Sequence, residues 1–234
     1  MNKFEQNKIV DNGLYYLLSW FSPNYPVGSY AYSHGLEYAV ETGIVDNIYH
    51  LENWIKDLLF YGTGANDAIF INQTYESILS NNYELFVDIA IMSKSYMPTQ
   101  EIALESEQQG ISFYKVTSAT LSSKKFEKLI NSIMSYITYP IVVGCAGALI
   151  NIKKIHLINS YLHAFISNIL SAALRIMPVG QTDIQCLLFK FKKDIQTISI
   201  NTLSKSLEDI GSSTFMIDWA SANHEGQYSR LFRS

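Results

Sequence analysis

Histidine side chains are the first candidates for metal chemistry in this 234-residue chain. His224 and Glu225 stand together as in a zinc-binding helix, but Tyr228 occupies the position where a second histidine would be required. His156 and His163 are seven residues apart on an expected helix. That is about two turns, or roughly 10 Å, which is too far for both to bind one metal ion directly. The histidine pattern therefore favours structural roles.

Other catalytic patterns are absent from the sequence. Cys145 and Cys186 have no Cys or His at ligand spacing, and their apolar helical surroundings predict buried, reduced thiols. The glycines at 62 and 64 lack the Gly-Lys-Ser/Thr ending of a phosphate-binding loop. No nucleophile elbow, dinucleotide fingerprint or carboxylate pair stands out. We therefore expect a protein that is not an enzyme, with no metal ligands of its own and no tightly bound cofactor.

One polar cluster stands at an expected helix start. Gln181 and Gln185 are four residues apart, so they share one face of a helix, and Asp183 falls in its first turn. A carboxylate there suits the positive end of the helix dipole, and helix capping alone could explain the whole cluster.

The elements that must position these residues all have helical periodicity. Apolar residues recur at three- and four-residue spacing around 48–59, 85–96 and 129–137, and no alternating strand pattern stands out. The segment 157–176 is apolar around most of its circumference, so we expect a central helix. Pro140 and Pro178 are expected in the first turns of helices. The sequence predicts an all-α fold, a single bundle of about eight to ten helices in one domain over residues 1–234.

Composition restricts the partners. Only 16% of residues are charged, against about 25% in typical proteins, and the net charge is −4. Acidity argues against nucleic-acid binding, which needs a basic face. The sparse charge fits a surface buried against partners, or a simple bias in residue usage. The N-terminal residues 1–8 are polar and no stretch reads as a membrane span, so we expect a cytoplasmic protein with no membrane partner.

The two ends of the chain depart from the helical pattern. Residues 22–33 form an irregular segment rich in proline and tyrosine, followed by a helix that Ser29 or Ser33 could cap. Residues 228–234 place Tyr228, Leu231 and Phe232 beside two arginines. Each end is either packed on its own domain or available as a protein-binding surface, since Tyr and Arg often carry interface energy.

These two ends also carry a family resemblance. The blocks are Pro26-Val-Gly-Ser-Tyr-Ala-Tyr-Ser-His-Gly-Leu-Glu37 and His224-Glu-Gly-Gln-Tyr-Ser-Arg-Leu-Phe-Arg-Ser234. Between them stand Tyr139-Pro140, Gly144-x-x-Gly147 and Pro178-x-Gly-Gln-x-Asp-x-Gln185. In this order they resemble the UreF family of urease accessory proteins over nearly the whole chain. Ser29 and Ile184 stand where that family often has glycine.

The resemblance implies a function in urease maturation. UreF-like proteins act as non-catalytic scaffolds and chaperones: they form homodimers, bind UreD (also called UreH) and recruit the GTPase UreG, so that the complex delivers nickel to apo-urease. Modulation of GTP hydrolysis by UreG is a further expectation. The alternative is an all-α protein that binds a ligand or cofactor and is unrelated to urease.

The resemblance also assigns residues. Tyr30 and Arg230 are expected to face UreG, and residues 215–234 are expected to dock on UreD and become ordered there. The partner-binding set that we expect from the two ends is Tyr30, His224, Glu225, Tyr228, Arg230, Leu231, Phe232 and Arg233. Gln181, Asp183 and Gln185 are expected to line part of an internal tunnel for nickel, which the complex rather than this chain would handle.

Overall fold

The computed structural model describes residues 13–234, and the polar stretch at residues 1–8 lies outside the described residues. Residues 13–20 are helical. The elements that follow are η1 (Ser29–Ala31), α2 (Leu36–Glu41), α3 (Ile48–Tyr61), α4 (Thr63–Leu79), α5 (Tyr83–Ser95), α6 (Gln100–Leu121), α7 (Lys124–Ser132), η2 (Met134–Tyr136), α8 (Tyr139–Leu149), α9 (Lys154–Ile176), α10 (Gln181–Lys190), α11 (Lys192–Thr202), η3 (Leu207–Asp209) and α12 (Phe215–His224), where η denotes a 3₁₀ helix. Residues 13–234 contain no strand, and the all-α prediction is confirmed.

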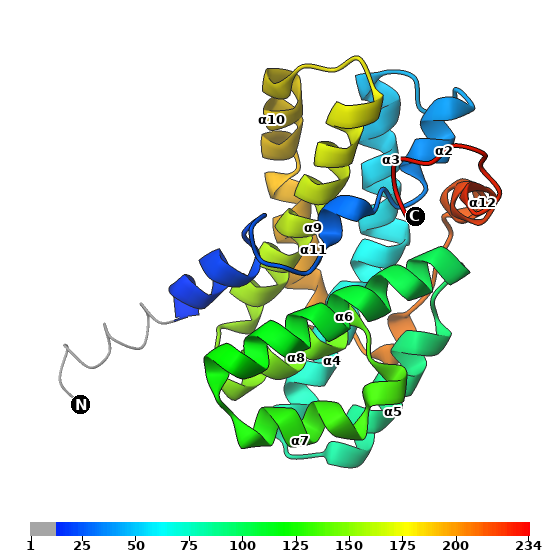
Figure 1. Cartoon of the computed structure of the whole chain (residues 1–234). Helices are drawn as coiled ribbons and strands as arrows, with labels where there is room; N and C mark the ends of the chain where they lie inside the picture. Colours follow the sequence, from blue (N-terminus) through cyan, green and yellow to red (C-terminus); the bar gives the residue numbers. More distant parts are fainter. Residues whose placement is uncertain (1–12) are drawn as a thin grey trace.

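The helices form two groups around a continuous apolar core. Helices α3, α9, α10 and α11 stand side by side, and α5, α6, α7 and α8 lie across one end of them (Figure 1). Helix α4 contacts both groups, since it packs against α3, α9 and α11 as well as α5 and α8. One cluster of buried side chains runs from Leu17 near the start of the described chain to Ala220 in α12.

The closest helix contact depends on a glycine of the Gly-x-x-Gly motif. Residues 140–148 of α8 are all buried. A Cβ atom on Gly144 would lie 3.0 Å from the carbonyl oxygen of Ile71 and 3.0 Å from Cβ of Thr74, both in α4. Any side chain at this position would push α8 away from α4, so the motif reflects packing rather than chemistry.

Helix α9 is the expected central helix. It contacts α2, α3, α4, α8, α10 and α11. It is the one helix in residues 13–234 long and apolar enough to cross a membrane, and 50% of its most apolar stretch is buried inside the protein. Such burial is what a core helix requires.

Local signals account for several helix starts, and two other expectations need correction. Asn47, Thr99 and Pro140 occupy the N-terminal positions expected of capping residues and a first-turn proline. Pro178 is not in a first turn, because α10 begins at Gln181 after an extended Gly180. Cys145 is buried as expected, but Cys186 is exposed, because the apolar face of α10 that packs inward carries Ile184 and Leu187 instead.

Candidate functional site

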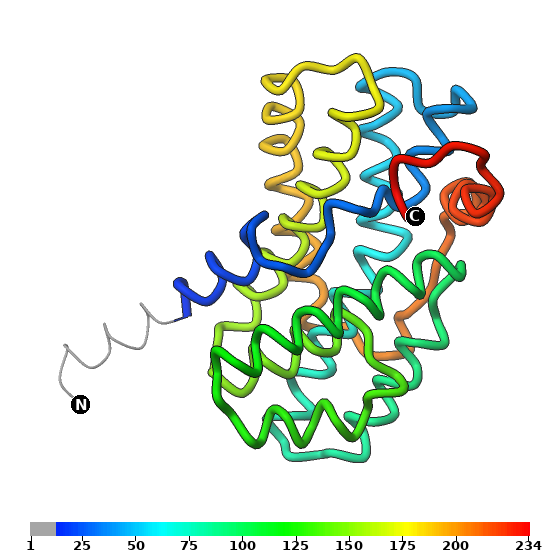
Figure 2. Tube along the Cα trace, viewed as in Figure 1, coloured from blue at the N-terminus to red at the C-terminus, as the bar shows by residue number. Residues whose placement is uncertain are grey.

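The last residues of the chain fold back across its own N-terminal segment. We use "tail" for residues 225–234, which follow α12. The amide of Arg233 donates to the carbonyl of Ala31 at 2.7 Å, and the amide of Ser33 donates to the carbonyl of Ser234 at 2.8 Å. Figure 2 shows the blue N-terminal segment meeting the red end of the chain. The two sequence blocks that departed from the helical pattern therefore form one continuous surface.

A buried imidazole holds the base of the tail. His224, at the end of α12, is 0% exposed. Its Nδ1 lies 2.8 Å from Oε2 of Glu101 in α6, and its Nε2 lies 3.1 Å from Oε2 of Glu37 in α2. Three helices thus meet at one side chain. Burial raises the pKa of Glu101, although the hydrogen bond and charge of His224 act against that increase.

Glu37 also accepts hydrogen bonds directly from backbone amides of the tail. Its Oε1 accepts from the amide of Leu231 at 2.7 Å, and its Oε2 accepts from the amide of Phe232 at 2.9 Å. Ser33 positions Glu37, since its hydroxyl accepts from the Glu37 amide at 3.2 Å, but the expectation that Ser29 or Ser33 caps α2 is wrong, because the N-cap residue is Gly35. A carboxylate that accepts several N–H groups satisfies backbone donors that water would otherwise have to reach.

The aromatic side chain of Phe232 is buried while its neighbours point outward. Phe232 is 3% exposed, whereas Tyr228 and Leu231 are exposed. The guanidinium carbon of Arg175 in α9 lies 4.1 Å from the centre of the Phe232 ring, in a cation–π arrangement. Phe232 therefore anchors the tail, and its neighbours cover the outer surface.

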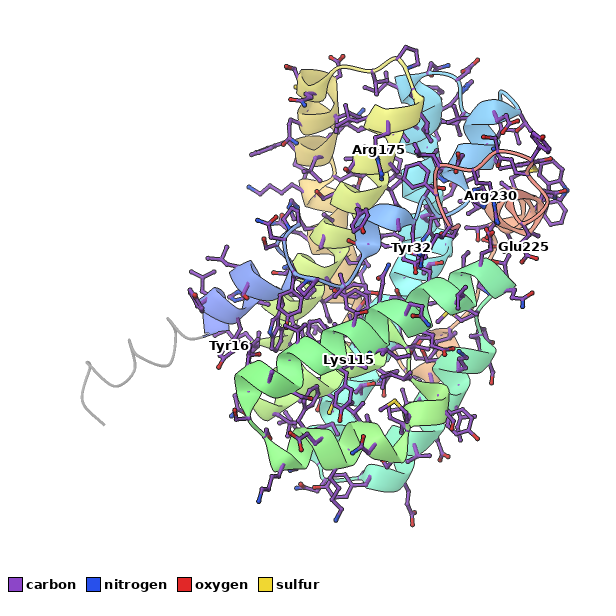
Figure 3. The ribbon with its side chains drawn as sticks, viewed as in Figure 1. Tyr16, Tyr32, Lys115, Arg175, Glu225 and Arg230 are labelled. Atoms are coloured by element: carbon purple, nitrogen blue, oxygen red, sulfur yellow. The ribbon has the colours of Figure 1, made fainter. Side chains whose placement is uncertain are left out.

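The outer surface of the tail carries most of the residues expected to bind partners. Arg230 is 41% exposed and its Nη1 lies 2.9 Å from Oε1 of Glu101. Tyr30, in η1, is 70% exposed. Arg233 and Glu225 are also exposed. Figure 3 shows Arg175, Arg230 and Glu225 in the same region as Tyr32, away from Lys115 and Tyr16. Of the expected partner-binding residues, only His224 and Phe232 are buried within the chain itself.

A second histidine links the tail to the interior. Glu105 of α6 accepts from the hydroxyl of Ser234 at 2.7 Å, and its Oε2 lies 3.2 Å from Nδ1 of His34. Burial alone would lower the pKa of His34, but the charge and hydrogen bond of Glu105 raise it overall. Nε2 of His34 is buried and has no hydrogen-bond partner among residues 13–234. Glu105 is thus shared by the tail and by a histidine that lines a cavity.

The cavity has a volume of about 500 Å³ and lies between α9, α10 and the N-terminal segment. Gln181 and Gln185 line it from α10, and His34 and Tyr30 line it from the N-terminal segment. Ile184, which stands where the resembling family often has glycine, is buried and also lines the cavity. Asp183 is exposed and is not among the lining residues. The two expected glutamines therefore face one cavity, and the carboxylate between them does not.

Helix α12 has an uncovered apolar face. Phe215, Met216 and Trp219 are exposed. The ring of Trp219 contacts the ring of Tyr38 in an edge-on arrangement, with 5.4 Å between centres. Aromatic side chains at a surface are typical of protein interfaces. This face adjoins the tail, since Gln227 of the tail donates to Glu41, in the same helix as Tyr38.

Sequence reasoning missed five residues of the site: His34, Glu37, Glu101, Glu105 and Arg175. One signal was available. Glu101 and Glu105 are four residues apart, and the same helical stripe continues to the buried Phe113. Two carboxylates on an otherwise inward face predict buried partners for both. Their partners at the end of α12 and in the tail are 123 to 129 residues away, and no local pattern could have named those.

Metal chemistry has no obvious centre here. Within residues 13–234, no three His, Cys, Asp or Glu side chains are arranged as a group that could hold a metal ion. The buried histidines are instead engaged with glutamates, as described above.

Comparison with known proteins gives a consistent result. The UreF family model matches residues 45–192. The urease accessory protein UreF of Bradyrhizobium sp. (strain BTAi1 / ATCC BAA-1182) is 37% identical over 221 residues, covering 94% of this chain and 92% of the relative. UreF of Rhodopseudomonas palustris (strain BisB18) is 35% identical over 94% of this chain and 92% of its own length. UreF of Methylobacterium sp. (strain 4-46) is 37% identical over 93% and 87%. By both the family model and these full-length relatives, the chain belongs to the UreF family of urease accessory proteins.

Proposed function

We propose that this protein is a non-catalytic scaffold for urease maturation, which binds UreD/UreH and recruits the GTPase UreG for the insertion of nickel into apo-urease. The observation that carries the proposal is the docked tail, which holds Arg230 against Glu101 and pairs with Ala31, the residue after Tyr30. An arginine held in a fixed position loses little conformational entropy on binding, and exposed tyrosines such as Tyr30 and Tyr228 supply contact area, which suits an interface. Family membership removes the alternative of a protein unrelated to urease.

We assign the outer surface of the tail to UreG and the exposed apolar face of α12 to UreD/UreH. UreG would contact Tyr30, Tyr228, Arg230, Leu231 and Arg233, with His224 and Phe232 supporting them from beneath and Glu225 at the rim. UreD/UreH would contact the exposed apolar face of α12 together with the adjoining tail. Modulation of GTP hydrolysis would follow from how UreG is held. A homodimer and a cytoplasmic location belong to the same proposal.

Nickel is the cargo of this process and not a resident cofactor of the chain. The cavity lined by Gln181 and Gln185 would give it a weakly binding path, because neutral amides hold a divalent cation less tightly than carboxylates or thiolates. Asp183 would act at the mouth of that path rather than within it, because it is exposed and does not line the cavity.

The test is co-purification of the complex with variants that leave the fold intact. Tyr228→Ala removes a fully exposed side chain, so the tail should stay docked while UreG is lost and UreD/UreH is kept. Arg230→Ala should also abolish UreG recruitment, but it breaks the contact with Glu101. Lys115→Ala, on an exposed part of α6 away from the tail, is the matched control. Unchanged UreG recruitment by Tyr228→Ala and Arg230→Ala together would contradict the proposal.

A further inference from the structure

The contacts of His224 fix how many protons its cluster must hold. Each of its ring nitrogens lies within hydrogen-bond distance of a carboxylate oxygen, Oε2 of Glu101 on one side and Oε2 of Glu37 on the other. A carboxylate and an unprotonated ring nitrogen are both acceptors, so each of these contacts needs its own proton. A neutral imidazole between two ionised carboxylates supplies only one. The cluster therefore holds one proton more than its neutral-imidazole form.

The position of that extra proton follows from the other contacts of Glu37. Both of its oxygens already accept backbone N–H groups, from Leu231 and Phe232, so a proton on Glu37 would compete with these contacts. The extra proton must lie in the contact between His224 and Glu101. Burial, which raises the pKa of Glu101, favours the presence of a proton there. Whether it resides on the nitrogen or on the oxygen, the proton count is the same.

The surrounding charges are consistent with a positive centre at this point. Arg230 lies against Glu101 from the tail, and Arg175 of α9 is close enough to Glu37 for the two charges to interact. Glu225 follows His224 and adds a negative charge near Glu101. With His224 protonated, the direct cluster of Glu37, Glu101, His224 and Arg230 has two negative and two positive charges. Removal of one proton would leave an uncompensated buried negative charge, which is costly.

We propose that the tail is held by a proton-dependent latch, in which docking of residues 225–234 requires one proton on the buried Glu37–His224–Glu101 cluster. Release of the tail takes Arg230 and the amides of Leu231 and Phe232 away from the cluster and opens it to water, where a free imidazole loses its proton near pH 6.5. Above that pH, docking must take up a proton from solution. Linkage then weakens docking by up to tenfold for each pH unit, until the docked cluster itself loses the proton. The surface formed by Tyr228 and Arg230 is thus presented in the proton-bound state.

One substitution separates the proton requirement from the contacts themselves. In Glu101→Gln, the amide oxygen can accept from Arg230 and the amide nitrogen can donate to Nδ1 of His224. A neutral imidazole then donates through Nε2 to Glu37, and every contact is satisfied without the extra proton. This variant should keep the tail docked and should lose the pH dependence of docking.

The experiment is hydrogen exchange on the full isolated chain between pH 6 and 9, read as protection factors for the amides of Leu231 and Phe232. Wild-type protection should fall above about pH 6.5 by up to tenfold per pH unit, and Glu101→Gln should remain protected with no such slope. His156→Gln changes an exposed histidine of α9 and should match the wild type. His34→Gln tests the other buried histidine and should retain the slope.

Three results would overturn the latch: wild-type protection that does not change with pH, a Glu101→Gln slope equal to that of the wild type, or a slope that disappears in His34→Gln. If the amides of Leu231 and Phe232 are unprotected at every pH in Glu101→Gln, the His224→Gln variant tests the latch instead. The latch requires that His224→Gln leave Leu231 and Phe232 unprotected even at pH 6, because an amide cannot carry the proton. Wild-type protection in His224→Gln would exclude it. None of these measurements involves a partner protein, so they stand apart from the scaffold proposal.

Discussion

Arg175 and Tyr30 are 145 residues apart in sequence, yet Nη2 of Arg175 donates to the carbonyl of Tyr30 at 2.6 Å. The same guanidinium stacks on the ring of Phe232. One side chain on the central helix α9 therefore joins the N-terminal segment to the tail. This relationship explains how the two ends of the chain are kept on one surface, and it makes Arg175 a positioning residue for both.

Arg175→Met should loosen the tail without unfolding the protein. The substitution removes a hydrogen bond and a cation–π contact, each of which contributes about 1 kcal/mol, but it keeps an apolar side chain against Phe232. We expect the amides of Leu231 and Phe232 to exchange about tenfold to thirtyfold faster, with little change in the exchange of the buried core. Lys193→Ala, on an exposed part of α11, is the control. Equal exchange in the two variants would show that Arg175 does not position the tail.

Gly110→Ala should destabilise the fold where α6 crosses the start of α8. A Cβ atom at this position would lie 3.0 Å from the carbonyl carbon of Thr138 and 3.1 Å from the amide nitrogen of Tyr139. Both are backbone atoms, so the helices must move apart at a cost of about 1–3 kcal/mol. Gly13→Ala is the matched control, since it is also helical but its new Cβ would have no atom of the described residues within 4 Å. That control should be neutral or slightly stabilising, by up to about 1 kcal/mol. Urea unfolding of both variants measures the difference.

A glycine inside a helical pattern, as Gly110 is, is consistent with either a break in the helix or the close approach of another helix. The helix α6 is continuous, and the close approach is the cause. Helix periodicity, the proline at 140 and the apolar character of α9 were sufficient to predict the class of fold because they are local properties. The exposure of Cys186 was not predictable in the same way, since it depends on which face of α10 packs inward.

The site was predicted less completely, and for a physical reason. Tyr30, Tyr228 and Arg230 could be selected from residue type and family resemblance. Their supports, Glu37 and Glu101, are charged residues that sequence patterns place at the surface. They are buried because His224, Arg230 and the tail amides satisfy them, and these partners come from the other end of the chain. Pairings between residues more than a hundred positions apart are set by the tertiary fold.

Asp67 of α4 should make the stability of the protein depend on pH. It is buried, it accepts a hydrogen bond from Tyr161 at 2.6 Å, and burial raises its pKa to about 7. The ordinary pKa of an unfolded aspartate is about 3.9, so the folded state holds the proton more tightly. The stabilisation of the folded state by protonated Asp67 is fully present below about pH 4 and is lost as the pH rises towards 7. The change amounts to at most about 4 kcal/mol over that range.

Asp67→Asn is the test of that titration. The amide oxygen can still accept from Tyr161, and no charge has to be buried at neutral pH. We expect the variant to be more stable than the wild type above pH 7, by about 1–3 kcal/mol, and the difference should shrink towards pH 4. Urea unfolding at pH 4, 6 and 8 measures it. Asp88→Asn, at an exposed position of α5, should follow the wild type at every pH. A difference between Asp67→Asn and the wild type that is constant with pH would contradict the assignment.

The double substitution Gln181→Leu and Gln185→Leu tests the cavity as a path for nickel. Both side chains line the cavity and are exposed at its α10 wall, so leucine should fit with little loss of stability. The apolar wall could no longer replace the water ligands of a passing cation, and that would slow its transfer. With the complex of UreD/UreH and UreG intact, we expect urease activation to fall at limiting nickel and to recover in part at excess nickel. Gln196→Leu, at an exposed position of α11 outside the cavity, is the matched control. Full activation by the double variant at limiting nickel would mean that the glutamines serve only to start helix α10.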